Sequence, residues 1–212
     1  MDYFIFDTET TGLNNRDEVI QFSALLVDET FETIKGFNSF YCMTSMPIHP
    51  EAYAVHKIKE EDLMELSGGK FFEEQFYDCM RGVPENVGFI HYSTGLDLRV
   101  VNQTLNNANL PSYDFGQKVA CLSEATGRHN YSPLGQIHKM TGVRTSLNNA
   151  LTLIAGYNQQ AFDTKFKNFV RLIQSSGKNL QIDLNSDSFK HNAFYDAFQL
   201  CYLMQHLQSN FR

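Results

Sequence analysis

Long apolar runs are missing from this sequence of 212 residues. A membrane-spanning helix needs roughly 18 or more apolar residues in succession, and stretches such as Ala24–Val27 are far shorter. The N-terminal Met-Asp-Tyr-Phe also lacks the basic start and apolar core of a secretory signal. We therefore expect a cytoplasmic protein that does not use a membrane.

Cysteine is scarce and scattered. The four cysteines, Cys42, Cys79, Cys121 and Cys201, include no Cys-x-x-Cys pair, which argues against a structural zinc site. We expect buried free thiols instead, because an unpaired cysteine behaves as a small hydrophobic residue.

The composition excludes a disordered chain, because 42% of the residues are hydrophobic and 13% are aromatic. The length suits one domain, residues 1–212. Three strands followed by alternating helices and strands predict an α/β fold with a central mixed sheet flanked by helices. The expected strands are 3–7, 19–28, 32–42, 87–91 and 119–122, and the expected helices are 60–66, 71–81, 96–107, 133–140, 158–175 and 192–208.

Basic residues are few in the first half of the chain. Residues 1–98 hold 6 Lys and Arg against 18 Asp and Glu, whereas residues 99–190 hold 10 against 5. An acidic overall field does not attract a polyanion. Acids gathered around metal ions beside a basic segment can nevertheless hold nucleic acid, so the charge does not exclude this class of partner.

The first expected strand runs into two acids, Asp7 and Glu9. Side chains alternate faces along a strand, so these two project to the same side. Adjacent carboxylates repel each other unless a cation or a proton lies between them, and their hard oxygen atoms suit Mg²⁺ or Mn²⁺. The alternative is an exposed strand end with two solvated acids.

Further candidate residues come later in the chain. Asp97 lies in the first turn of a helix that follows a buried strand, where an acid also suits the helix dipole. His191 and Asp196 are five positions apart, about 140° around a helix. They can converge if His191 lies just before the helix and Asp196 lies in its second turn. Taken alone, His191 is typical of a surface histidine.

Together these segments resemble the DEDDh branch of the 3′–5′ exonucleases, the family of the proofreading subunit of bacterial replicative DNA polymerases. The family's Asp-x-Glu-Thr-Thr-Gly start is present at Asp7–Gly12, its second acidic motif matches Asp97, and its His-x-Ala-x-x-Asp-Ala motif matches His191–Ala197. Glu51–Ile58 resembles the Glu-Ala-x-x-Val-His-x-Ile stretch of the proofreading subunits. The resemblance covers residues 3–208 and implies a ribonuclease H-like fold.

The resemblance also implies phosphodiester hydrolysis with two divalent metal ions, Mg²⁺ or Mn²⁺. Asp7, Glu9 and Asp196 would hold one of these ions, with Asp7 bridging to the second, and Asp97 would act largely through metal-bound water. His191 would take the proton from the attacking water, a task that suits histidine near neutral pH. The product would be a nucleoside 5′-monophosphate released from a 3′ end.

Contacts to the terminal nucleotide follow from the same resemblance. Thr10, Gly12 and Leu13 would meet this nucleotide, with Leu13 against its base, and Val55 and His56 would border the other side of the base. Plain core packing is the alternative for Leu13 and Val55. The expected partner is single-stranded nucleic acid, because stacking and backbone contacts read no base sequence.

Three functions stay open. DNA is favoured as the substrate by the matches at residues 10–12 and 55–56. An RNA-directed enzyme, such as an oligoribonuclease or a ribonuclease T-like enzyme, would use the same active site, and contacts to a 2′-hydroxyl cannot be read here. A non-catalytic nucleic-acid-binding relative would generally have lost an acid or the histidine, and all five are present.

The sequence departs from the family at three points. The second motif is one residue longer than usual, and Tyr92 or Ser93 falls where the family has an asparagine. The separation of Asp97 from His191 is also longer, so we expect a family-atypical insertion within 143–187. The chain ends soon after the last expected helix, from which we expect no polymerase-docking tail and a stand-alone nuclease.

Overall fold

The computed structural model describes residues 1–92, 95–116, 119–121, 146–155, 157–178, 180–185 and 187–210. Its strands are β1 (Tyr3–Thr10), β2 (Val19–Val27), β3 (Ile34–Tyr41), β4 (Gly88–His91) and β5 (Val119–Cys121). Its α-helices are α1 (Pro50–His56), α2 (Leu63–Ser67), α3 (Phe72–Arg81), α4 (Leu96–Asn107), α6 (Leu147–Ala155), α7 (Gln159–Ser175) and α8 (Ala193–Asn210), and its 3₁₀ helices are η1 (Glu60–Asp62) and η2 (Asp187–His191).

In the part of the chain that the structure describes, the five strands form one mixed sheet in the order β3-β2-β1-β4-β5. The first three strands pair antiparallel, and β1 pairs parallel with β4, which pairs parallel with β5. The expected α/β fold with a mixed sheet is therefore confirmed. Because β1 and β4 are parallel neighbours, their C-terminal ends meet at one edge, where α/β proteins commonly bind ligands.

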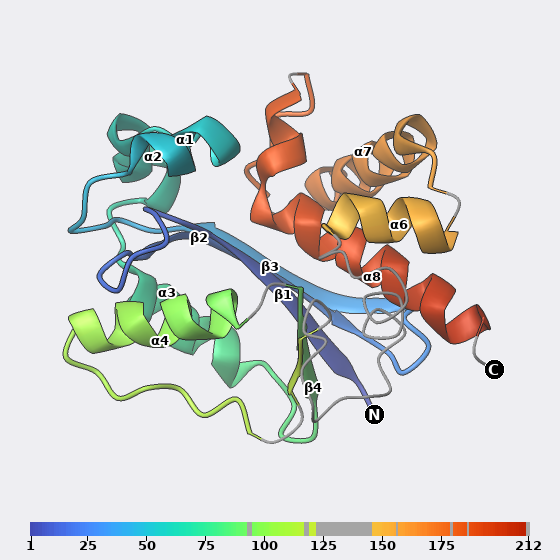
Figure 1. Ribbon diagram of the computed structural model, residues 1–212, viewed down its shortest axis with the longest axis horizontal. Helices are drawn as coiled ribbons and strands as arrows, with labels where there is room; N and C mark the ends of the chain where they lie inside the picture. The colour runs from blue at the N-terminus through green and yellow to red at the C-terminus, as the bar shows by residue number, and fades with distance from the viewer. Residues whose placement is uncertain are drawn as a thin grey trace.

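The sheet lies between two layers of helices (Figure 1). Helices α6, α7 and α8 cover one face, and α3 and α4 cover the other. Helix α8 contacts β1 and β2 directly, so it is buried between the sheet and its neighbouring helices. This position holds the start of α8 against the end of β1, although 183 residues separate Thr10 from Ala193 in the sequence.

Most predicted elements lie where periodicity placed them, and α4 has the predicted bounds. Helix α1 is not among the expected helices, and it begins at a proline, Pro50. Proline is favoured in the first helical turn, where its missing N–H has no helical partner, and Glu51 follows it there. Helix α6 was also missed, and the predicted helix at 133–140 lies outside the described residues.

Three cysteines are buried free thiols, as predicted: Cys42, Cys79 and Cys201. The side chain of Cys121 lies outside the described part. Among the helices that the structure describes, none is long and apolar enough to cross a membrane.

Candidate active site

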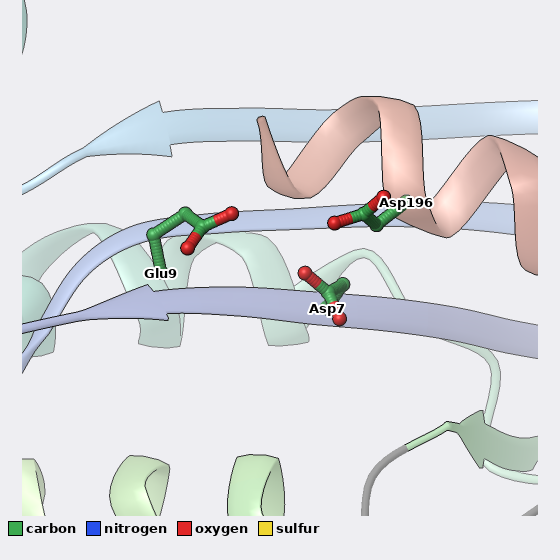
Figure 2. Close-up of side chains that lie close together, drawn as sticks. All are labelled: Asp7, Glu9 and Asp196. Carbon is green, nitrogen blue, oxygen red and sulfur yellow. The ribbon is translucent and has the colours of Figure 1, made fainter. Parts of the chain in front are cut away.

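Three carboxylates, two from the start of the described chain and one from near its end, lie close together between β1 and α8. Asp7 and Glu9 point from β1 towards α8, and Asp196 points back from the first turn of that helix (Figure 2). One oxygen atom from each carboxylate lies within 4.8 Å of the others. The expectation that Asp7 and Glu9 share a face is therefore confirmed.

Asp196 lies in the first turn of α8, not in the second turn as predicted. The reason is that Asn192 caps the helix instead of beginning it. Its side-chain oxygen accepts a hydrogen bond from the Phe194 amide at 3.0 Å, as a capping residue does. Capping brings Asp196 one position closer to the helix start and leaves His191 just before it, in η2.

The three carboxylates are strained electrostatically without a cation. Burial raises the pKa of Asp7 and of Glu9 well above the usual values, and the neighbouring charges of Asp97 and Asp196 raise both further. Burial, followed by the charge of Asp97, raises the pKa of Asp196 to about 7. A divalent cation would relieve this repulsion, and carboxylate oxygens are the ligands that Mg²⁺ and Mn²⁺ prefer. The residues present therefore fit such a metal.

Asp97 does not belong to this trio of mutually close ligand atoms. It is buried in the first turn of α4, with an exposed fraction of 2%. Thr8, which lies between Asp7 and Glu9 and projects to the opposite face of β1, donates a hydrogen bond from Oγ1 to Asp97 Oδ1 at 2.7 Å. On the other carboxylate oxygen, Oδ2, the contact is His91 Nδ1 at 3.4 Å. The hydrogen bond from Thr8 thus orients Oδ1, whereas His91 Nδ1 lies near Oδ2 without forming a hydrogen bond.

Replacing Thr8 by valine is expected to lower the turnover number by about 10-fold or more, the scale of outer-shell effects at metal sites. Valine has nearly the same shape but cannot donate to Asp97 Oδ1, so the carboxylate loses its orientation. The Mn²⁺ concentration that gives half-maximal activity should rise in parallel. Thr8→Ser, which keeps the hydroxyl, is the control. Wild-type turnover and Mn²⁺ dependence in Thr8→Val would show that the hydrogen bond has no role in the reaction.

His191 is not in contact with the trio. Its side chain is exposed, and the described residues give it no hydrogen bond or ion pair. It lies on the wall of a cavity of about 590 Å³, together with Tyr41 and Asn192. The imidazole is therefore available to solvent and substrate close to the start of α8.

A cavity of about 560 Å³ lies beside Glu9 and brings together all five predicted nucleotide contacts: Thr10, Gly12, Leu13, Val55 and His56. Leu13 is 70% exposed and Val55 is 56% exposed, so the alternative of plain core packing is wrong for both. Exposed apolar side chains on the wall of a cavity suit a flat, apolar group such as a base.

Gly12 shapes the loop that carries Leu13. A Cβ atom at Gly12 would lie 2.6 Å from His49 Cδ2 and 2.7 Å from Asp17 Oδ2, so a larger residue would displace this loop. His49 also donates its backbone N–H to the Thr11 carbonyl at 2.8 Å, and its Nε2 lies 3.2 Å from Asp17 Oδ1. Sequence reasoning missed His49 and Asp17, because contacts between distant loops have no local signal.

His56 is a buried member of this cavity wall, with an exposed fraction of 4%. Its Nδ1 accepts a hydrogen bond from the Ile58 amide at 3.0 Å, so Nε2 carries the proton of the neutral ring. Burial lowers the pKa of His56 to about 4. The ring is therefore neutral at physiological pH. It can line the cavity, but it carries no positive charge with which to bind a phosphate.

The chain matches a family model described as "Exonuclease" (RNase_T) over residues 4–117. A comparison with curated proteins gives no match. Among solved structures, the zinc-bound E. coli ExoI–ssDNA complex is 17% identical with a TM-score of 0.64, covering 98% of this chain and 40% of that one. The chain thus spans about 40% of the length of exonuclease I.

Two further structures match nearly over their full length. The nuclease domain of 3′hExo, described as a DEDDh family member bound to rAMP, is 11% identical with a TM-score of 0.63, covering 99% of this chain and 92% of that one. Exonuclease X in complex with 5′ overhanging duplex DNA is 18% identical with a TM-score of 0.57, covering 98% and 92%. These matches confirm the ribonuclease H-like exonuclease fold.

The family match covers more than half of the chain, and it includes β1 and the start of α4. The chain therefore belongs to the exonuclease family. The five residue types of the DEDDh motifs are present in the chain, at Asp7, Glu9, Asp97, His191 and Asp196, and the matched family is one of enzymes.

Proposed function

We propose that this protein is a metal-dependent 3′–5′ exonuclease that releases nucleoside 5′-monophosphates from single-stranded DNA. The observation that carries the proposal is the convergence of Asp7, Glu9 and Asp196 beside a cavity that Leu13 and Val55 line with exposed apolar surface. A reactive phosphate at the carboxylates would place its 3′ nucleoside in that cavity.

Asp7, Glu9 and Asp196 would hold two divalent ions, Mg²⁺ or Mn²⁺, with Asp97 supporting them through water. When bound, such ions neutralise charge on the scissile phosphate and make water a better nucleophile at neutral pH. The protein's part is to keep four carboxylates fixed: two on β1, one on α8 and one, oriented by Thr8, on α4.

His191 would act as the general base. Its exposed imidazole lies two residues before α8, where it can accept a proton from the attacking water. The water oxygen bonds to phosphorus as its proton passes to His191. The bond from phosphorus to the 3′ oxygen of the upstream sugar breaks, and this oxygen takes up a proton from solvent. The products are a nucleoside 5′-monophosphate and a strand one nucleotide shorter with a free 3′-hydroxyl. General bases of this kind contribute about 10²–10⁴-fold to a rate.

DNA is the proposed substrate because Thr10–Gly12 and Val55–His56 match the proofreading subunits, and both segments line the nucleotide cavity. RNA is the second candidate, since a DEDDh nuclease domain with the same fold binds rAMP. A release assay with labelled single-stranded DNA and RNA of one sequence, with and without Mg²⁺, tests the proposal. Mg²⁺-dependent release of 5′-monophosphates from DNA is expected. Faster release from RNA would select the second candidate, and release from neither would refute both.

Leu13→Ala and Val55→Ala are each expected to raise the KM for single strands about 5- to 100-fold while changing kcat little. Loss of a base-stacking contact costs roughly 1–3 kcal/mol, and the contact acts on binding instead of on the reacting bond. Steady-state kinetics on a short oligonucleotide measure the effect. Met64→Ala, which removes another exposed apolar side chain away from the cavity, is the control. An unchanged KM in both variants would contradict stacking at this cavity.

A further inference from the structure

Buried polar side chains from two strands hold the segment that links His191 to Asp196. Gln21 on β2 accepts a hydrogen bond at Oε1 from the backbone N–H of Ala193, the first residue of α8, at 3.1 Å. Asn192 donates from Nδ2 to the Tyr41 hydroxyl on β3 at 3.0 Å. The exposed fractions of these three side chains are 0% for Gln21, 6% for Asn192 and 8% for Tyr41.

These side chains share one face of the sheet with a candidate metal ligand. Gln21 pairs with Glu9 in the β1–β2 ladder and with Tyr41 in the β2–β3 ladder, so the three residues form a row across three strands. Cross-strand partners in a sheet project to the same face. The row therefore extends from Glu9 to the hydroxyl that binds Asn192.

Burying polar side chains at this place costs free energy unless they form hydrogen bonds. β2 is otherwise an almost entirely buried strand, and a buried amide or hydroxyl without partners costs about 1–3 kcal/mol. An apolar side chain at position 21 would fill the same space without this cost. At the start of α8 two of these bonds are present, because Gln21 Oε1 bonds the helix backbone and the Tyr41 hydroxyl bonds the cap. Gln21 Nε2 is buried without a hydrogen-bond partner among the described residues, so the amide is kept here at a cost.

His191 depends on this segment for its position. Its own side chain is exposed and has no partner among the described residues, whereas Asn192 next to it is buried and bonded. Asp196 lies four residues further on, and its amide donates to the Asn192 carbonyl at 3.2 Å. A shift of Asn192 would thus move both residues relative to Asp7 and Glu9.

We propose that Gln21, Tyr41 and Asn192 form a positioning anchor that aligns His191 and Asp196 with the carboxylates of β1. The anchor rests on the proposed function, and its members touch neither the phosphate nor the metals. Tyr41 Oη accepts from Asn192, so the hydroxyl keeps its own proton for a second acceptor. Burial raises the pKa of Tyr41 to about 12, so the hydroxyl is neutral and can take part in these hydrogen bonds at physiological pH.

Two variants each remove the hydrogen bond between Asn192 and Tyr41, one by removing its acceptor and the other by removing its donor. Tyr41→Phe removes only the hydroxyl, and Asn192→Ser removes the Nδ2 donor while keeping a good helix cap. Each is expected to lower kcat about 10- to 100-fold with an unchanged KM for single-stranded DNA, and to weaken Mn²⁺ binding measured by calorimetry. Because both remove the same interaction, the double variant should behave as the single ones do.

Tyr157→Phe is the matched control. It removes a tyrosine hydroxyl that accepts from Gln199 on α8 at 2.9 Å and lies 3.4 Å from the Tyr195 hydroxyl. This hydroxyl bonds side chains of α8 but neither its cap nor its first backbone amide. It should cost similar thermal stability and leave kcat and Mn²⁺ affinity unchanged. A lower Tm with wild-type kcat and Mn²⁺ affinity in Tyr41→Phe and Asn192→Ser would reduce the anchor to a structural contact and overturn the proposal. An inactive wild-type protein would instead refute the proposed function, and Mn²⁺ binding would still test the anchor.

Discussion

Asp196→Asn is expected to abolish detectable turnover while it stabilises the metal-free protein. Asparagine keeps the shape of the side chain but removes the charge, so it is a poorer metal ligand and no longer repels Asp7, Glu9 and Asp97. The rate should fall at least about 1,000-fold, because the lost charge acts on a phosphate-transfer transition state. The Tm in EDTA at pH 8 should rise by about 5 °C, the size expected for one or two kcal/mol in a domain of this length.

The stability gain has a defined pH dependence. The pKa of Asp196 is raised by folding to about 7, so protonated Asp196 favours the folded state. This stabilisation is fully present below the pKa of the unfolded chain, near 4, and is lost as the pH rises through 7. The Tm of wild-type protein in EDTA should therefore fall from pH 5 to pH 8, whereas Asp196→Asn should show a flatter profile. Mg²⁺ should restore the wild-type Tm at pH 8.

Glu60→Gln, which neutralises an exposed acid on η1, is the control for both measurements. It should alter neither turnover nor the response of Tm to Mg²⁺. If Asp196→Asn kept wild-type turnover, or if Mg²⁺ changed its Tm as much as that of wild-type protein, Asp196 would not be a metal ligand.

His191→Ala is expected to lower kcat about 100- to 10,000-fold with little change in KM, because proton transfer matters in the transition state and not in binding. The exposed position of the ring on a cavity wall allows a sharper test. Added imidazole should enter the space left by the substitution and restore part of the lost rate. Single-turnover measurements at increasing imidazole concentration would follow this recovery.

His206→Ala is the control, since His206 lies near the far end of α8 and its Nδ1 is 2.9 Å from the Tyr202 carbonyl. Its rate should match wild-type protein and should not respond to imidazole. If His191→Ala retained full kcat, the histidine would be structural and another group would have to accept the proton.

The sequence predicted those parts of the site that depend on local order. Asp7 and Glu9 share a face because a strand alternates, and Asp97 lies in the first turn of α4 because periodicity located that helix correctly. The position of Asp196 was wrong by one residue, since the start of α8 depends on Asn192 acting as a cap. A cap of this kind is weakly marked in sequence when the preceding residues are also polar.

The partners of these residues could not be predicted. Thr8 reaches Asp97 across 89 positions, and Gln21 reaches Ala193 across 172. Such contacts arise from the packing of α4 and α8 against the sheet, which no window of sequence contains. The exposure of Leu13 and Val55 likewise depends on how α1 faces the loop after β1, and α1 itself was missed.

The trio of carboxylates brings residues 7 and 196 together, and this determines when the trio can form during protein synthesis. The strand with Asp7 and Glu9 leaves the ribosome early, but its third partner is made only after nearly the whole described chain. Domains assemble in the direction of translation, so a nascent chain carries two of these three acids long before the third. We therefore expect the proposed metal site to be complete only after the last helix has docked on the sheet.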